Sequence, residues 1–339
     1  MKILKLLGIT LSLSLLAGTA SGADEARARQ FRFGYGLQEQ SNQGRAARMF
    51  SEEVDKLSGG KMKVKTIGAS AAGSDVAMQQ ALIDGNLEMM VGSTSTLVTI
   101  AKEMALWDTP FLMSNTKEAD LLLDGPIGER VKAKLYDKGL VGLVYWENGF
   151  RNLTNNIRPI QRMEDLGGIK LRVMQNAVFM ESFKTLGASP VPLAFSDLFT
   201  AMEKTSVDGQ ENPYNTILSS KFYEVQKYLT VTNHVYSPWI MLVSRKFWDS
   251  LSAPEKDMLT KAAKASRDFE RQDSREEAMR ALNELKAKGM KVNELTFSEA
   301  TRMRNKLTRV YALIGANVGM DLMIETQNEL MKARTARKS

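Results

Sequence analysis

From residue 30 onward, short segments of alternating apolar and polar residues are followed by longer ones whose apolar residues recur every three or four positions. The alternation is typical of half-buried strands, and the longer period is typical of helices with one apolar face. The elements predicted in this part are strands at Phe31–Tyr35, Met62–Thr66, 87–91 and 140–145, a helix over 46–57 ending at Gly59-Gly60, and a helix capped by Ser74. This β-α-β-α order predicts a mostly parallel sheet with helices on its faces.

The same pattern begins again after about residue 150. A strand is predicted at 169–173, and Asn176 is placed to cap a helix with the apolar stripe Phe179, Phe183 and Leu186. A short strand at 190–193 follows, and Ser196 is expected to cap the next helix. Two sets of α/β elements predict two lobes, and the cleft between two lobes is a common place for a small-ligand site.

One predicted helix is much longer than the others. Ser252 and Glu255 form a capping box, and after Pro254 no helix breaker follows until Gly289, so the helix would be ~50 Å long. Its ends carry apolar stripes, whereas 270–277 is wholly polar. We therefore expect a strut between the lobes that is buried at both ends and solvated in the middle; a break near Asp273 is the alternative.

We expect the lobes to be built from discontinuous parts of the chain. Lobe one is predicted to comprise 24–148 and 238–272, and lobe two 149–237 and 273–339.

The first residues have the pattern of a secretory signal peptide, predicted over 1–23. Lys2 and Lys5 precede an apolar run from Leu6 to Ala17, and small residues follow at 20–23. The apolar run is too short for a membrane-spanning helix, which needs ~20 residues. We therefore expect an exported, periplasmic protein.

The composition excludes several kinds of functional site. The 339 residues include no cysteine and one histidine, His234, which excludes disulfide scaffolds, thiol nucleophiles and zinc sites built from Cys or His. The formal charge of +7 is spread along the chain without an aromatic-interleaved basic motif, so nucleic acid is not an expected partner. Gly68–Ser74 lacks the lysine of a phosphate-binding loop. We expect no enzyme, cofactor or metal; the alternative is a secreted hydrolase using Asp75 or Glu39 with His234.

Five segments carry a more specific signal. They are N-G-F-R-N-L-T-N (148–155), L-R-V-M-Q (171–175), G-A-S-P-V-P-L-A-F-S-D-L (187–198), V-D-G-Q-E-N-P (207–213) and F-Y-E-V-Q-K-Y-L-T-V-T-N-H (222–234). With them the chain resembles the solute-binding proteins of tripartite ATP-independent periplasmic (TRAP) transporters over nearly its whole length after the leader.

The resemblance implies an α/β, two-lobe, type II-like periplasmic-binding-protein fold with a long bridging helix. It also implies a monomeric receptor that captures an organic acid and delivers it to membrane permease subunits. The family's carboxylate-binding arginine matches Arg172, a second arginine matches Arg151, its asparagine matches Asn212, and the aromatic residue that packs on the ligand matches Phe195. A guanidinium suits this task because its paired donors match the two oxygens of a carboxylate.

Three departures bear on the ligand. Sialic-acid-binding members have an acidic residue near the position of Ser93, and Pro-Asn where this chain has Met174 and Gln175. Sialic acid is therefore not the expected ligand, and Gln175 joins the candidate site.

By analogy with the family, the first-lobe side of the cleft would carry Glu39, Asp75 and Ser93. Two carboxylates there would repel a second ligand charge but accept hydrogen bonds from hydroxyl groups. Trp239 is expected to pack on a sugar ring, and Trp146 could do the same or belong to the core. These residues favour a sugar acid, a hexuronate such as glucuronate or galacturonate or a related aldonate, over a C4-dicarboxylate.

Overall fold

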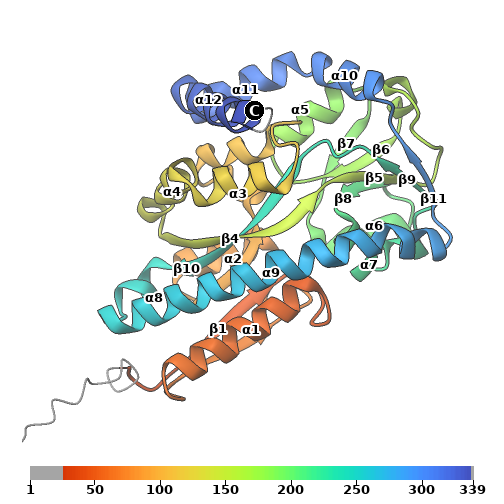
Figure 1. The fold of residues 1–339 in the computed structure, drawn as a ribbon. Helices are drawn as coiled ribbons and strands as arrows, with labels where there is room; N and C mark the ends of the chain where they lie inside the picture. Colours follow the sequence, from red (N-terminus) through yellow and green to blue (C-terminus); the bar gives the residue numbers. More distant parts are fainter. Residues whose placement is uncertain (1–25, 337–339) are drawn as a thin grey trace, which may run out of the picture.

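A computed structural model describes residues 26–336, and the predicted signal peptide over 1–23 lies outside the described residues. The chain forms two mixed sheets that lie side by side, with helices on both faces of each (Figure 1). The predicted two-lobe α/β class is confirmed, whereas the prediction of mostly parallel sheets is only partly right, because each sheet also contains antiparallel pairs.

The first sheet has the strand order β2-β1-β3-β10-β4. Its strands are β1 (Arg29–Tyr35), β2 (Met62–Ile67), β3 (Met89–Ser93), β4 (Leu140–Phe150) and β10 (Tyr236–Ser244). β1 pairs in parallel with β2 and β3, while β10 runs antiparallel between β3 and β4. One face packs against α1 (Asn42–Leu57) and the start of α9 (Ala253–Ala287), and the other against α2 (Asp75–Asp84), α3 (Thr116–Asp124) and α4 (Pro126–Ala133).

The second sheet has the order β11-β9-β5-β8-β6-β7. Its strands are β5 (Asn152–Asn155), β6 (Lys170–Val173), β7 (Ser189–Pro192), β8 (Gly209–Asn212), β9 (Tyr228–Val231) and β11 (Lys291–Glu294). α6 (Phe195–Glu203), α7 (Tyr214–Ser219) and the end of α9 share one core cluster with this sheet, and α5 (Ala177–Thr185) packs on its other face.

The chain passes between the sheets at three places. β4 leads into β5, β9 leads into β10, and α9 leads into β11. At the first two crossings the backbone N–H of Arg151 donates to the carbonyl of Val235 (2.9 Å), so these two segments are joined side by side.

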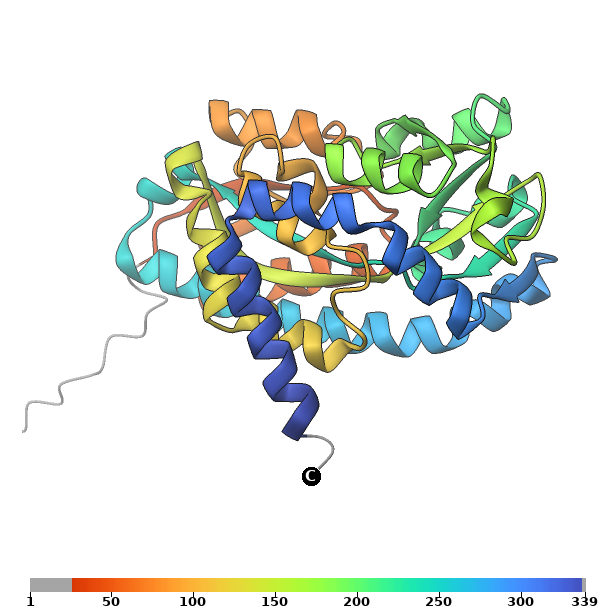
Figure 2. The ribbon, with the colours of Figure 1, turned by 90° about the horizontal axis from the view of Figure 1, so that it is seen from above.

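The C-terminal helices return towards the first sheet. α11 (Thr308–Val318), which follows α10 (Phe297–Lys306), contacts the short 3-10 helix η3 (Lys102–Asp108), and α12 (Met320–Ala336) contacts α3 (Figure 2). The lobe ranges stated from the sequence stay a prediction.

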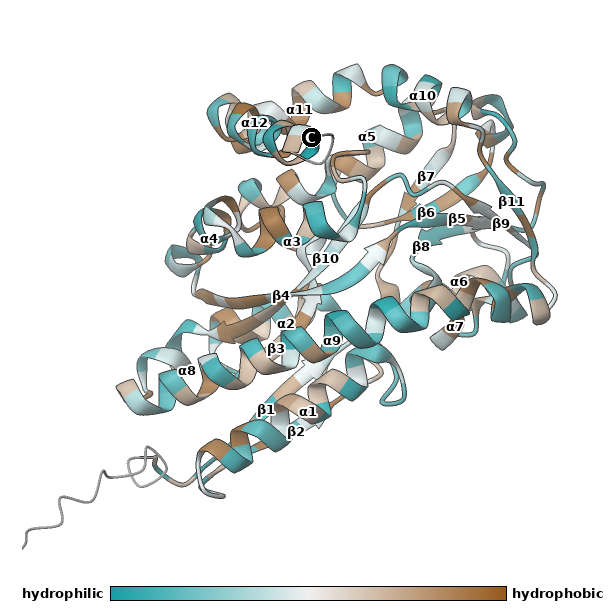
Figure 3. Cartoon of the chain, in the orientation of Figure 1, coloured by the Kyte–Doolittle hydropathy of each residue, from teal (hydrophilic) through white to brown (hydrophobic). Residues whose placement is uncertain are grey.

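The long helix is continuous from Ala253 to Ala287, and its predicted capping box is present: Ser252 Oγ accepts from the N–H of Glu255 and Glu255 accepts from that of Ser252. α9 contacts α1 and β4 at one end and α7 further along, so it does bridge the two sheets. Its outward face is mostly hydrophilic (Figure 3).

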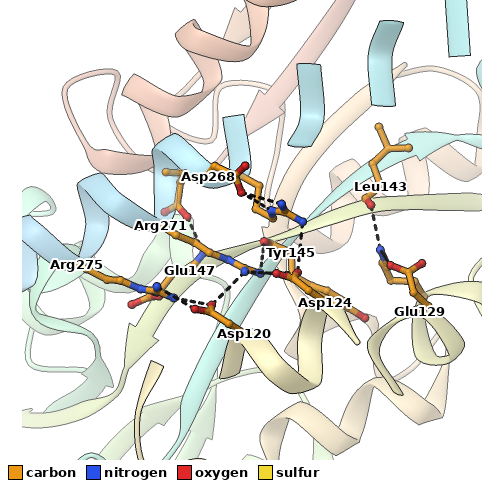
Figure 4. A network of polar contacts seen from close by, with 12 residues as sticks. Asp120, Asp124, Glu129, Leu143, Tyr145, Glu147, Asp268, Arg271 and Arg275 are labelled. Carbon is orange, nitrogen blue, oxygen red and sulfur yellow. Dashed lines mark hydrogen bonds and ion pairs between the residues drawn. The ribbon is translucent and has the colours of Figure 1, made fainter. Parts of the chain in front are cut away.

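The prediction that the middle of this helix is solvated is only partly right: Gln272 and Glu276 are exposed, whereas another face is buried. Glu270, Arg271 and Ser274 are buried because α1, α3 and β4 supply polar partners for them. Arg271 pairs with Asp124 on α3 (2.6 Å), as Figure 4 shows. This run of charged residues therefore contains a buried polar network on one face of the helix and a solvated face beside it.

Most predicted helix caps are present. Ser74 and Asn176 each accept from the backbone N–H three residues ahead. Ser196 is not a cap, because α6 already begins at Phe195 after Ala194, which makes no side-chain cap. Within residues 26–336, no helix combines the length and the apolar run that crossing a membrane requires.

Candidate functional site

A cavity of about 40 Å³ lies where the two sheets meet. Six residues expected from the sequence line it: Asp75, Ser93, Arg151, Phe195, Asn212 and Trp239. The structure does not bring Glu39 and Gln175 to this cavity, because both are exposed to solvent outside it.

Arg172 lies on β6, and its side chain is buried, with 1% of its surface exposed; it is not among the residues that line the cavity. Nε donates to the carbonyl of Leu193 (2.9 Å), whereas Nη1 is buried with no hydrogen-bond partner among the described residues. Burial lowers the pKa of Arg172 to about 10, so the guanidinium still carries its charge at neutral pH. The charges of Glu211, Asp75 and Asp197 favour the ionised form, but none of them forms an ion pair with Arg172 among the described residues. An anion brought to Nη1 would supply that direct partner.

Arg151, at the crossing between β4 and β5, already has a carboxylate partner. Its Nε and Nη2 both donate to Glu211 on β8, with Nη2 2.8 Å from Oε1. His234 Nε2 lies 3.1 Å from the other oxygen of Glu211, and its Nδ1 lies 2.8 Å from the Thr232 hydroxyl. Burial opposes ionisation of Glu211, but Arg151 and His234 hold its pKa below the ordinary value. The charge of Arg151 is therefore neutralised within the protein.

Asp75 begins α2 and faces the cavity from the first sheet. The N–H of Ser93 donates to its Oδ2 (2.9 Å), which fixes the carboxylate at the end of β3. Burial raises the pKa of Asp75, while this hydrogen bond and the charge of Arg172 lower it again in part. An ionised carboxylate accepts but does not donate, so Asp75 can receive hydrogen bonds from ligand hydroxyl groups.

A polar cluster under the cavity joins the two lobes. Asn176, the cap of α5, donates through Nδ2 to the Asp108 carboxylate and to the Ser95 carbonyl, both at 2.9 Å. The Ser95 hydroxyl donates to the other Asp108 oxygen (2.5 Å). Burial raises the pKa of Asp108 to about 7, against the opposing effect of these donors. The cluster ties the segment after Arg172 to the segment after Ser93.

The apolar walls come from two aromatic residues. Trp239 on β10 lies in register with Ser93 on β3, and the half-buried Phe195 packs against Phe222 with ring centroids 6.0 Å apart. Trp146 lies in the core instead, edge-on to Phe33, and does not line the cavity.

The sequence reasoning missed four polar residues of this region. Gln43, Asn148 and Thr216 line the cavity, and the Thr216 hydroxyl donates to Asn148 Oδ1 (3.0 Å). Glu211 was overlooked although it stands directly before Asn212 in the Q-E-N-P segment. Its acidic side chain in a buried strand was the available signal, because a buried carboxylate needs a cationic partner.

Comparisons with known proteins agree with this architecture. The family pattern described as bacterial extracellular solute-binding protein, family 7, matches residues 33–317. The sugar acid binding protein DctPAm of Advenella mimigardefordensis, solved with galactonate, is 47% identical with a TM-score of 0.89, over 91% of this chain and 99% of that one.

Two further proteins are similar over most of the chain. A TRAP periplasmic solute-binding protein of Polaromonas sp. JS666, solved with D-erythronate, is 36% identical with a TM-score of 0.85, over 88% of this chain and 98% of that one. The 2,3-diketo-L-gulonate-binding periplasmic protein YiaO of Escherichia coli is 32% identical over 289 residues, which cover 85% of this chain and 88% of that protein.

Proposed function

Since the chain belongs to family 7 of the bacterial extracellular solute-binding proteins, we propose that it is the receptor of a TRAP transporter for a sugar acid. Members of this family bind solutes for transport and are not enzymes. The receptor would act as a monomer outside the cytoplasm, capture its ligand between the two lobes and pass it to membrane permease subunits.

The observation that carries this proposal is the buried guanidinium of Arg172. Its Nη1 has no partner among residues 26–336, although it is shielded from solvent. A ligand carboxylate would supply the missing hydrogen bond and an anion in direct contact with the guanidinium. Charge-assisted hydrogen bonds of this kind are about twice as strong as neutral ones.

The surrounding charges favour one ligand carboxylate over two. Arg151 matches a second arginine of the family, but Glu211 already takes two of its donors. Arg172 then supplies the positive charge, and Asp75 on the other lobe would repel a second ligand carboxylate. A C4-dicarboxylate would leave one of its charges without a cation.

The polar residues around Asp75 support a ligand rich in hydroxyl groups. Ser93, Gln43 and the Asn148–Thr216 pair all reach the same cavity. The proteins compared above are named for galactonate, D-erythronate and 2,3-diketo-L-gulonate, each of which is a monocarboxylate with several oxygen substituents. Hexonates such as galactonate therefore join glucuronate and galacturonate as leading candidates.

The present cavity is too small for such a ligand. Small-molecule sites usually have about 300–1,000 Å³, whereas this one has about 40 Å³. Binding therefore requires the lobes to part and close again around the ligand, and parting would also uncover Arg172.

The test is a binding panel on the purified protein. Galactonate, gluconate, galacturonate and glucuronate are compared with succinate and malate by thermal shift and then by calorimetry. A ligand at 100 times its dissociation constant adds about 2.7 kcal/mol to stability, so a true ligand raises the melting temperature clearly. Submicromolar binding of succinate or malate with no response to any sugar acid would overturn the proposed ligand class.

A further inference from the structure

An open groove of about 790 Å³ lies directly outside the ligand cavity. The groove and the cavity share three lining residues, Gly36, Leu37 and Phe195. The groove is bordered by the loop before α1 on the first lobe and by α6 and the end of α7 on the second, so it runs along the mouth of the cleft.

Gly36 lines both the groove and the cavity. A Cβ atom at this position would lie 3.8 Å from both Phe195 Cδ1 and the Ser70 hydroxyl oxygen, and 3.9 Å from Asp75 Oδ1. These are ordinary contact distances, so a methyl group would fit without a clash but would occupy the gap. The missing side chain leaves room for part of a ligand to extend past Phe195.

The backbone of the groove is strained on both sides. Six non-glycine residues between 26 and 336 have φ in the left-handed region, and three of them line this groove: Ala69 (56°), Ser70 (55°) and Lys221 (55°). Such conformations cost of order 1–3 kcal/mol each and cluster at functional sites. Three residues with this conformation, from both lobes, line the same groove, which indicates a ligand-binding site rather than an accidental gap.

The lining suits an uncharged sugar ring. Phe195 and Phe199 offer aromatic surface, and Ser196 and Ser220 offer hydroxyl groups. The lining contains one lysine, Lys221, and two carboxylates, Glu224 and Glu277. Glu277 is already paired with Arg45 (3.1 Å). The groove therefore has no excess of positive charge that would favour a second carboxylate.

We infer that this groove is a second sugar subsite, so that the receptor also takes acidic disaccharides whose inner unit is the sugar acid and whose outer unit is a neutral sugar. This inference rests on the proposed function, because the inner unit occupies the cavity near Arg172. Aromatic faces would pack on the C–H face of the outer ring, and the serine hydroxyls would exchange hydrogen bonds with its hydroxyl groups.

The probes are gluconate and lactobionate, which is gluconate carrying a galactose unit, titrated calorimetrically into the full chain. We expect lactobionate to bind at least as tightly as gluconate. Ser196→Trp would fill the groove from an exposed position on α6 and should weaken lactobionate at least tenfold while changing gluconate less than twofold. Thr200→Trp, on the same helix but outside the groove lining, is the matched control and should change neither.

Gly36→Ala provides a second test, because it adds a methyl group where the groove and the cavity meet, and should weaken lactobionate much more than gluconate. If gluconate binds and lactobionate binds more weakly than gluconate, or if Ser196→Trp weakens both ligands equally, the second subsite is overturned and the proposed function stays intact. Failure of every monosaccharide acid of the panel to bind would instead contradict the proposed function.

Discussion

Glu270 should make the protein more stable when its carboxyl group is replaced by an amide. It is fully buried in the middle of α9, and it has no cationic partner among the described residues. The N–H of Glu147 donates to one oxygen (2.7 Å), and the Ser274 hydroxyl lies 2.5 Å from the other. Burial, with a smaller contribution from the nearby Glu147, raises the pKa of Glu270 from 4.5 to about 8.

The sign of the effect follows from proton linkage. The native state keeps a proton on Glu270 up to about pH 8, whereas the unfolded chain releases it near its ordinary pKa of 4.5. Between these values the native state binds more protons, so this group makes stability fall as pH rises. At 1.36 kcal/mol per pKa unit, the loss is about 3 kcal/mol at pH 7 and approaches about 5 kcal/mol above pH 8.

Glu270→Gln removes this pH-dependent loss of stability because the amide does not ionise. The N–H₂ of the amide can donate to the Ser274 hydroxyl oxygen. We expect the variant to exceed the wild type in unfolding free energy by about 3 kcal/mol at pH 7 and by under about 1 kcal/mol at pH 5. Urea unfolding at pH 5, 6, 7 and 8 measures the unfolding free energy of the variant and of the wild type. The difference between the two isolates Glu270, because the other titrating groups contribute equally to both. Glu284→Gln, exposed on the same helix, is the control. A variant that is less stable than the wild type at pH 8, or a difference independent of pH, would refute the reasoning.

Three further predictions concern the site. Arg172→Lys keeps the charge but loses the forked donors, so sugar-acid affinity measured by calorimetry should fall by about 1.5–3 kcal/mol; near-wild-type affinity would show that Arg172 is not the anchor. Glu211→Gln leaves the buried Arg151 without its counter-charge and should lower the free energy of unfolding by about 3–5 kcal/mol. The exposed control Glu224→Gln should not lower it. A loss under about 1 kcal/mol in Glu211→Gln would contradict the pairing of Arg151 with Glu211. Because the ligand can enter only when the lobes are parted, the ligand-free protein should populate an open form in solution, and saturating ligand should then reduce the radius of gyration measured by small-angle X-ray scattering; identical curves with and without ligand would exclude lobe closure.

The features that the sequence predicted well depend on residues close together in the chain. Ser74, Asn176 and the Ser252–Glu255 pair were identified as caps because a cap and its acceptor or donor are three residues apart. The cap predicted at Ser196 was wrong by two positions, because α6 begins at Phe195 and its N-cap is Ala194, which makes no side-chain hydrogen bond.

The features that the sequence did not predict depend on distant partners. Nothing local to Arg151 indicates that Glu211 will take its donors, and nothing in 270–277 indicates that Asp124 and Asn42 will cover that polar run. Residue type alone also could not separate Asp75, which reaches the cavity, from Glu39, which stays in solvent.

The position of β10 has a consequence for how the protein is made. β3 pairs with β10, so the strand that contains Ser93 has no partner on that side until Trp239 has been synthesised. α9, which covers one face of the first sheet, is synthesised later still. Until then an unpaired strand edge and an uncovered apolar face prevent the first sheet from reaching its native form. Contacts between parts so distant in sequence also slow folding. A newly made chain therefore cannot complete its first sheet until β10 has been synthesised, and it stays in an unfolded state for longer.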